Sequence, residues 1–137
     1  GGKDGVHAPG VRTNPLEAKA FAEATGADLV AVAVGSSHAM TTRDATLDFE
    51  LIAEIARTVS VPLVLHGSSG VSDPDLQKAV KVGMSKINIA THLNNVFTHE
   101  IREALGANPK LVDPRKYIAP GREAVATEVA RLLTLLG

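Results

Sequence analysis

The hydrophobic positions of the chain fall into two patterns, short continuous apolar runs and longer stretches with helical spacing. The continuous runs predict strands buried on both faces, because they show no alternation with polar residues. Several of the longer stretches begin at N-cap residues or prolines and stop at glycines, which is typical of helices. The pattern predicts strands over residues 28–34, 61–65 and 86–89, helices over 15–25, 48–59, 75–82, 93–105 and 122–136, a glycine-rich loop over 1–13 and a proline-containing connector over 108–120.

Helices and strands alternate along the chain, which is typical of βαβ units in a parallel sheet. Three strands with their helices could form a small open sheet or an arc of a (β/α)8 barrel. An isolated three-stranded parallel sheet would leave two long apolar edges, which favour aggregation. The pattern therefore predicts an α/β fold and favours a fragment of a larger domain.

Composition narrows the class of protein. Of the 137 residues, 45% are hydrophobic and 3% aromatic, and the formal net charge is −1. Nucleic acids and acidic membranes need a basic partner surface, so the composition argues against both. The chain has no cysteine, which excludes disulfides and cysteine-bound zinc. No apolar run is long enough to cross a bilayer and no signal-peptide core precedes the fold, so we expect a cytoplasmic protein.

Polar residues stand where each predicted strand ends. The motif GSSH, ending at His38, follows the first strand, and HGSSG, beginning at His66, follows the second. Ligands of parallel α/β folds bind at the carboxyl ends of the strands. Two imidazoles on successive strands can converge on one metal ion, and histidine suits zinc well. Each histidine could instead only hydrogen-bond a neighbouring loop, but their shared position at strand ends favours a metal.

The small residues after the second and third strands are candidates for an anion site. The loop Gly67-Ser68-Ser69-Gly70 offers backbone N–H groups and two hydroxyls just before a helix, as phosphate-binding loops do. A plain tight turn explains this loop equally well, whereas Ala90 and Thr91 at the neighbouring strand end favour phosphate. Asn88 interrupts an apolar strand, so its amide holds either a substrate oxygen or a backbone group. We interpret three other histidines as surface or structural residues: His7, His92 and His99.

The motifs DLVAVAVGSSHAM, VPLVLHGSSGVSD, KINIATHLN and DPRKYIAPGREAV together resemble the class II, zinc-dependent ketose-bisphosphate aldolases, the fructose- and tagatose-bisphosphate aldolase family. Their order and spacing match from the first residue nearly to the last, and LVLHGSSG followed by KINIAT is the specific part. The resemblance implies a (β/α)8 TIM barrel, of which residues 1–137 form the C-terminal half of a single domain, about strands six to eight with their helices. The N-terminal half is then absent from this chain.

The resemblance also implies half of an active site. The family's zinc is held by three histidines, two of which correspond to His38 and His66. The third histidine and the acid/base aspartate belong to the missing half, so no catalytic residue is expected here. The implied substrate-binding residues are Gly67, Ser68, Ser69, Ala90 and Thr91 around the phosphate of dihydroxyacetone phosphate, and Asn88 near the reacting carbons. A monovalent cation, Na+ or K+, is implied at the backbone of Val34, Ala39 and Gly67.

The implied activity is zinc-dependent, reversible aldol cleavage of a phosphorylated ketose to dihydroxyacetone phosphate and an aldehyde. Such a lyase would serve glycolysis or other carbohydrate metabolism as a cytoplasmic homo-oligomer acting on a small sugar phosphate. Zinc would polarise the ketone carbonyl and stabilise the enediolate left by cleavage. The alternative is a non-catalytic half-barrel that retains only a phosphate- or metal-binding site. With two ligands alone, we expect the isolated chain to bind zinc weakly.

The chain departs from the family pattern at four positions. Ala39 stands where the family usually has Gly, which makes close approach of the backbone harder. His92 and Asn94 stand where the family usually has an acidic and then a basic residue, and that basic residue helps to hold the distal phosphate of a sugar bisphosphate. Ala90 resembles the tagatose-type branch, because fructose-specific members often carry Asp there. These departures leave the sugar unassigned.

Overall fold

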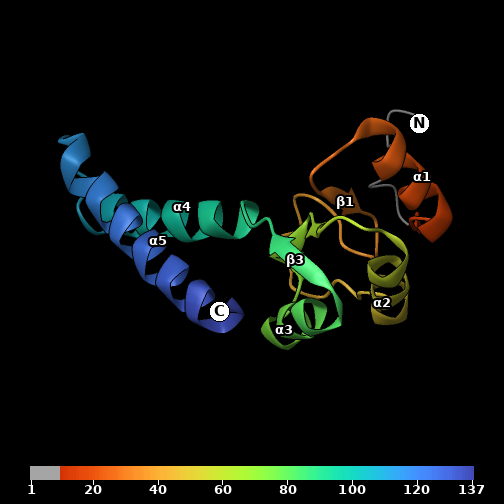
Figure 1. Cartoon of the computed structure of the whole chain (residues 1–137). Helices are drawn as coiled ribbons and strands as arrows, with labels where there is room; N and C mark the ends of the chain where they lie inside the picture. Colours follow the sequence, from red (N-terminus) through yellow and green to blue (C-terminus); the bar gives the residue numbers. More distant parts are fainter. Residues whose placement is uncertain (1–9) are drawn as a thin grey trace. The chain divides into compact units, whose positions relative to one another are not determined.

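The structure of the protein is a computed structural model that describes residues 10–137. Most of the expected loop over residues 1–13, and all of His7, therefore lie outside the described residues. The chain divides into two compact units, Gly1–Ile89 and Ala90–Gly137. The first unit is built on a sheet and the second from two helices (Figure 1).

A parallel sheet organises the first unit. Its elements are α1 (Pro15–Thr25), β1 (Val30–Val32), α2 (Phe49–Thr58), β2 (Leu63–Leu65), the 3-10 turn η2 (Ser68–Gly70), α3 (Asp73–Val82) and β3 (Met84–Ile87). The three strands pair in sequence order and all run parallel. Leu63 of β2 is aligned with Val30 on one side and Met84 on the other. The predicted α/β fold with a parallel sheet is confirmed.

Local capping fixes the helices of this unit. The side-chain oxygen of Asn14 accepts hydrogen bonds from the backbone N–H groups of Leu16 and Glu17, just ahead of the proline that opens α1. The hydroxyl of Ser72 caps α3 in the same way. At the other end of α3, Gly83 has a φ of 138°, a conformation that favours glycine. The start and stop signals in the sequence therefore placed these helices within two residues.

The core of the first unit lies around β2. All three residues of β2 are buried, as are Ile52 and Ile55 of α2 and Leu76 and Ala79 of α3. The prediction that this strand is buried on both faces is confirmed. Burying residues on both sides of a central strand is what a parallel sheet covered by helices requires.

The same prediction is wrong for the first strand. Expected over residues 28–34, it forms only Val30–Val32, in which Val30 and Val32 are buried and Ala31 is exposed. The preceding Leu29 is 46% exposed. Successive residues of a strand point to opposite faces, so only the face that carries Val30 and Val32 is packed and the face that carries Ala31 is open. A continuous apolar run therefore predicts a strand but does not show that both of its faces are buried.

The third strand is shifted relative to the prediction of residues 86–89. It begins at Met84, directly after the glycine that ends α3, and stops at Ile87. Met84 is buried, whereas Ser85 and Lys86 are exposed. Asn88 therefore follows the strand instead of lying inside it, which places its amide at the carboxyl edge of the sheet.

Two helices make up the second unit, α4 (Thr91–Ala107) and α5 (Pro114–Leu136), and they pack against each other. The helices approach closely at Gly121, where a Cβ atom would lie 2.9 Å from both Cδ2 and the carbonyl oxygen of Phe97. No residue of α4 is buried, and α5 buries only Gly121 and Leu132. Among residues 10–137, no helix has the length and apolar character that a bilayer crossing needs.

The expected connector over residues 108–120 is too long. Helix α5 already begins at Pro114, where the side chain of Asp113 accepts a hydrogen bond from the N–H of Arg115. Pro120 lies inside the helix. A proline removes one backbone hydrogen bond and can kink a helix, but the next residue packs closely on α4, and this tertiary contact outweighs the local cost.

Candidate functional site

The loops that follow β1 and β2 lie against each other. The hydroxyl of Ser36 donates a hydrogen bond of 2.5 Å to the carbonyl oxygen of His66. At Gly67, a Cβ atom would lie 2.5 Å from the carbonyl oxygen of Ser37, so the two backbones approach too closely for any side chain. The ring centres of His38 and His66 are 5.7 Å apart, with the ring planes inclined at 61°. The structure thus brings together the two histidines that the sequence singles out.

This separation suits a shared metal ion. Zinc lies about 2.0–2.1 Å from a histidine nitrogen, so two rings on one tetrahedral ion have centres about 5 Å apart. The 5.7 Å between the rings of His38 and His66 is close to that spacing. His38 is exposed and His66 half-buried, so the pair is open to solvent. Among residues 10–137, no three His, Cys, Asp or Glu side chains form a metal-binding group, so the ligand role of the pair stays a prediction.

The predicted phosphate loop forms the 3-10 turn η2. Gly67 precedes the turn with a φ of 62°, in the left-handed region. Ser68 is 2% exposed, and its hydroxyl donates a 3.2 Å hydrogen bond to the carbonyl oxygen of Leu65. Any contact of Ser68 with an anion would therefore use its backbone N–H. Ser69 is half-buried, and phosphate binding by the turn stays a prediction.

Asn88 stands at the carboxyl end of β3, next to the end of β2. Its backbone N–H donates to the carbonyl oxygen of Leu65 at 3.0 Å. Its side-chain oxygen accepts a 2.6 Å hydrogen bond from the ammonium group of Lys86, not from a backbone group. Sequence reasoning missed this lysine, although residues two apart in a strand share a face and could have signalled it. The hydrogen bond between Lys86 and Asn88 therefore places a positive charge beside the amide at this edge of the sheet.

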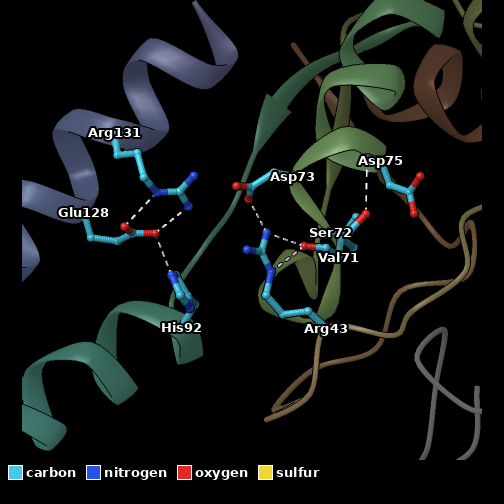
Figure 2. A network of polar contacts seen from close by, with 8 residues as sticks. All are labelled: Arg43, Val71, Ser72, Asp73, Asp75, His92, Glu128 and Arg131. Atoms are coloured by element: carbon cyan, nitrogen blue, oxygen red, sulfur yellow. Dashed lines mark hydrogen bonds and ion pairs between the residues drawn. The ribbon is translucent and has the colours of Figure 1, made fainter.

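Ala90 and Thr91 belong to the second unit. Ala90 is the N-cap residue of α4 and offers no side-chain cap, and Thr91 begins the helix. In the first turn, Nε2 of His92 lies 2.7 Å from Oε1 of Glu128, which also accepts a hydrogen bond from Arg131 (Figure 2). These contacts tie the start of α4 to α5.

The carboxyl group at the centre of this contact is strongly perturbed. The hydrogen bond from Arg131, reinforced by that with His92, lowers the pKa of Glu128 from 4.5 to about 2, against an opposing effect of burial. His92 therefore has a structural contact, in agreement with its interpretation from the sequence as a surface or structural residue.

Ala39 has an unusual backbone. Its φ of 58° makes it the one described non-glycine residue with a positive φ. Glycine would suit this backbone conformation better than alanine, because the left-handed region is costly for residues with a Cβ. Among the three backbone positions predicted for a monovalent cation, the carbonyl oxygen of Val34 already accepts from the N–H of Asp48 at 2.9 Å. A carbonyl oxygen has a second lone pair, so the cation site stays a prediction.

Arg43 is a further residue that sequence reasoning missed. Its Nε donates to the carbonyl oxygen of Val71 at 2.9 Å, and its Nη2 donates to Oδ1 of Asp73 at 2.6 Å (Figure 2). These partners are 28 and 30 residues away along the chain. No local pattern could have predicted contacts of that separation.

The fold and the strand-end groups define a class of protein, a parallel α/β protein whose candidate ligands gather at the carboxyl edge of its sheet. The chain matches the family described as fructose-bisphosphate aldolase class-II over residues 1–137. It belongs to this family, which confirms the resemblance found in the motifs.

Solved structures agree with this assignment. The chain is 36% identical to the YdjI aldolase from Escherichia coli K12, with a TM-score of 0.78 over 94% of this chain and 47% of that one. It is 30% identical to a protein from Coccidioides immitis that is provisionally assigned as a fructose-1,6-bisphosphate aldolase, with a TM-score of 0.79 over 99% and 48% of the two chains. The fructose-bisphosphate aldolase from Campylobacter jejuni, at 22% identity and a TM-score of 0.75 over 91% and 45%, shares the fold. The chain therefore spans about half the length of these structures.

Proposed function

We propose that this chain forms the C-terminal half of a (β/α)8 TIM barrel and supplies part of the active site of a class II aldolase. The reaction is the reversible aldol cleavage of a phosphorylated ketose to dihydroxyacetone phosphate and an aldehyde. The observation that carries the proposal is the 5.7 Å separation of the His38 and His66 rings at neighbouring strand ends. Family membership over the whole chain and the coverage of about half of each solved relative support it.

His38 and His66 are the proposed zinc ligands, with a third ligand supplied by the N-terminal half of the barrel. When bound, zinc supplies Lewis-acid polarisation of a ketone carbonyl. Neutral imidazoles leave the ion its full positive charge, which suits an anionic intermediate. The acid/base carboxylate that moves the proton of the cleaved hydroxyl also comes from the N-terminal half. A Na+ or K+ ion at the backbone of Val34, Ala39 and Gly67 completes the proposed ion set.

The substrate is a small sugar phosphate, bound at the same edge of the barrel. Backbone N–H groups of η2 and of the Ala90-Thr91 segment are the proposed phosphate donors. The amide of Asn88 is proposed to contact the substrate near the reacting carbons, where the nearby ammonium of Lys86 adds positive charge. The sugar stays unassigned, because Asn94 cannot supply a cation for a distal phosphate. We also propose that the full-length protein is a cytoplasmic homo-oligomer that acts in carbohydrate metabolism.

A second candidate is a half-barrel without turnover that retains only phosphate or metal binding. Both candidates agree with the lack of a three-residue metal-binding group within residues 10–137, because each places only His38 and His66 in this chain. The two candidates differ in a measurable way, because only the first predicts zinc-dependent cleavage of a carbon–carbon bond by the full-length protein.

The test is an aldolase assay on the full-length protein, with fructose 1,6-bisphosphate and tagatose 1,6-bisphosphate as probes. Removal of metal by a chelator should abolish cleavage and added Zn²⁺ should restore it. His38→Ala and His66→Ala should each lower kcat/KM by at least about 100-fold, because a metal held by three ligands loses one. His99→Ala, an exposed histidine on α4, is the matched control and should leave kcat/KM unchanged.

Full activity in the two ligand variants would refute the aldolase proposal. Metal or phosphate binding without any cleavage would support the non-catalytic candidate. Calorimetry on the isolated 137-residue chain adds a further check, since tight one-to-one zinc binding would contradict the requirement for a ligand from elsewhere.

A further inference from the structure

The segment that carries His38 is a long connection between β1 and α2 with no helix or strand of its own. His38 itself is exposed. A zinc ligand on an exposed, irregular segment needs other contacts to fix its place, because a shift of an ångström or less changes how well two rings share one ion. The residues on either side of His38 provide such contacts.

Before His38, two contacts join the segment to the chain around the second histidine. The hydroxyl of Ser36 donates to the carbonyl oxygen of His66, and the backbone of Ser37 lies directly against Gly67. After His38, Met40 packs on Gly70 so closely that no Cβ atom would fit there. These contacts follow the same order along both segments, so the two loops run side by side.

Arg43 makes the most extensive of these contacts. Its guanidinium donates from Nε and Nη2 to the carbonyl oxygen of Val71, at 2.9 and 2.6 Å, and from Nη2 to Oδ1 of Asp73 at 2.6 Å (Figure 2). Val71 is fully buried, and Asp73 is the first residue of α3. The N–H of Ala45 then donates to the carbonyl oxygen of Gly70 at 3.0 Å. The arginine thus anchors the far end of the segment to a rigid point of the core.

We propose that Arg43 is a positioning residue that holds the His38 segment against the His66 segment, so that the two imidazoles meet one metal ion. This inference rests on the function proposed above. Arginine suits the task because its planar group can donate to a carbonyl and a carboxylate at once, whereas lysine carries a single point charge. Arg43 does not touch the metal in this arrangement and acts only through the placement of His38.

The test compares Arg43→Met with the unchanged full-length protein. The dissociation constant for Zn²⁺, measured by competition with a chelator at a temperature where the metal-free protein is folded, should rise about 10- to 100-fold. The visible absorption bands of the Co²⁺-loaded protein should change as well, because they report ligand geometry. Arg43→Lys should recover part of the affinity through its pairing with Asp73. Arg57→Met, an exposed arginine at the end of α2, is the control and should change neither quantity.

A residue that merely stabilised the fold would lower the melting temperature of the metal-free protein and leave the zinc affinity and cobalt spectrum of the folded protein unchanged. That result would overturn the positioning role. Equal losses in the Arg57 control would overturn it too, because they would point to a general effect of charge. If Arg43→Met does not fold, Asp73→Asn decides, and unaltered zinc affinity there refutes the proposal. Failure of the unchanged protein to bind zinc would instead refute the proposed function, and this is visible before any variant is made.

Discussion

The two units of the chain are held together by different means. The sheet unit buries whole residues around β2, with Leu63 and Leu65 at 1% and 0% exposure. The helical unit buries no residue of α4 and only Gly121 and Leu132 of α5, and its contacts include the close approach of Gly121 to Phe97 and the polar contacts of Glu128. The candidate metal ligands both lie in the unit with the larger core.

This difference bears on which unit can hold a metal site rigidly. A metal site needs side chains held within fractions of an ångström, and a close-packed core with few rotamers provides that rigidity. The helical unit buries fewer residues, so an equivalent truncation there removes less packed surface. The comparison predicts that equivalent changes have larger effects in the sheet unit than in the helical one.

Truncation of a core leucine in each unit gives the largest expected effect. Leu65→Ala should lower the free energy of unfolding by about 3–5 kcal/mol, because it leaves a cavity in a fully buried strand. Leu132→Ala, at 6% exposure in α5, should lower it by about 2–3 kcal/mol. Urea unfolding followed by circular dichroism measures both. Leu133→Ala, at 70% exposure, is the control, and equal losses at Leu65 and Leu132 would remove the contrast between the units.

The contact between the helices can be tested at its narrowest point. Gly121→Ala should destabilise the protein by about 1–3 kcal/mol, because the new methyl group would lie 2.9 Å from Phe97. Gly106→Ala in α4 is a matched control with nothing within 4 Å of the new Cβ, and it should stabilise by roughly 0.5 kcal/mol. Thermal unfolding distinguishes the two. A neutral Gly121 variant would show that the helices part easily at this contact.

The polar contact of the helical unit makes a smaller, pH-dependent contribution. Because the pKa of Glu128 is lowered to about 2, its ionised form stabilises the folded state above pH 4.5, and this contribution is lost as the pH falls toward 2. Glu128→Gln should therefore cost about 1 kcal/mol at neutral pH and little near pH 2. Unfolding measured across this range tests the sign. The exposed Glu123→Gln on the same helix is the control, and a pH-independent loss would contradict the assignment.

The smallest expected change in stability is at two residues of the sheet unit whose backbone lies in the left-handed region. Ala39 has a φ of 58° and Gly26 a φ of 64°, and a Cβ at Gly26 would meet nothing within 4 Å. Ala39→Gly should stabilise the protein by roughly 0.5–1 kcal/mol, and Gly26→Ala should destabilise it by a similar amount. Differential scanning calorimetry measures both shifts. Opposite signs are required, and a loss at Ala39→Gly would mean that the methyl group makes a favourable contact.

The features predicted correctly from the sequence depend on short stretches of chain. Asn14 and Ser72 cap their helices through residues two or three positions away, so their patterns are sufficient. The parallel order of the strands followed from alternation with helices, and this placed His38 and His66 at the same edge of the sheet. Their ring separation agrees with that inference, while their binding of zinc stays a prediction.

The features that were missed depend on contacts between distant residues. Arg43 meets partners 28 and 30 positions away, which no local pattern records. The exposure of Ala31 depends on what covers that face of β1, which an apolar run cannot reveal. The start of α5 was different, because Asp113-Pro114 repeats the signal correctly used at Asn14-Pro15. The predicted connector nevertheless extended to Pro120, which lies inside α5, and the next residue packs on α4.

Because Gly121 has no side chain, its close contact with Phe97 also bears on how far the turn between the last two helices can vary. Since this glycine can face Phe97 in only one alignment, the alignment of α4 and α5 is set inside the helices and not by the residues that join them. Insertions between Asn108 and Asp113 should accordingly be tolerated, and a short tag or fluorescent label placed there should report on the protein without shifting either helix along the other.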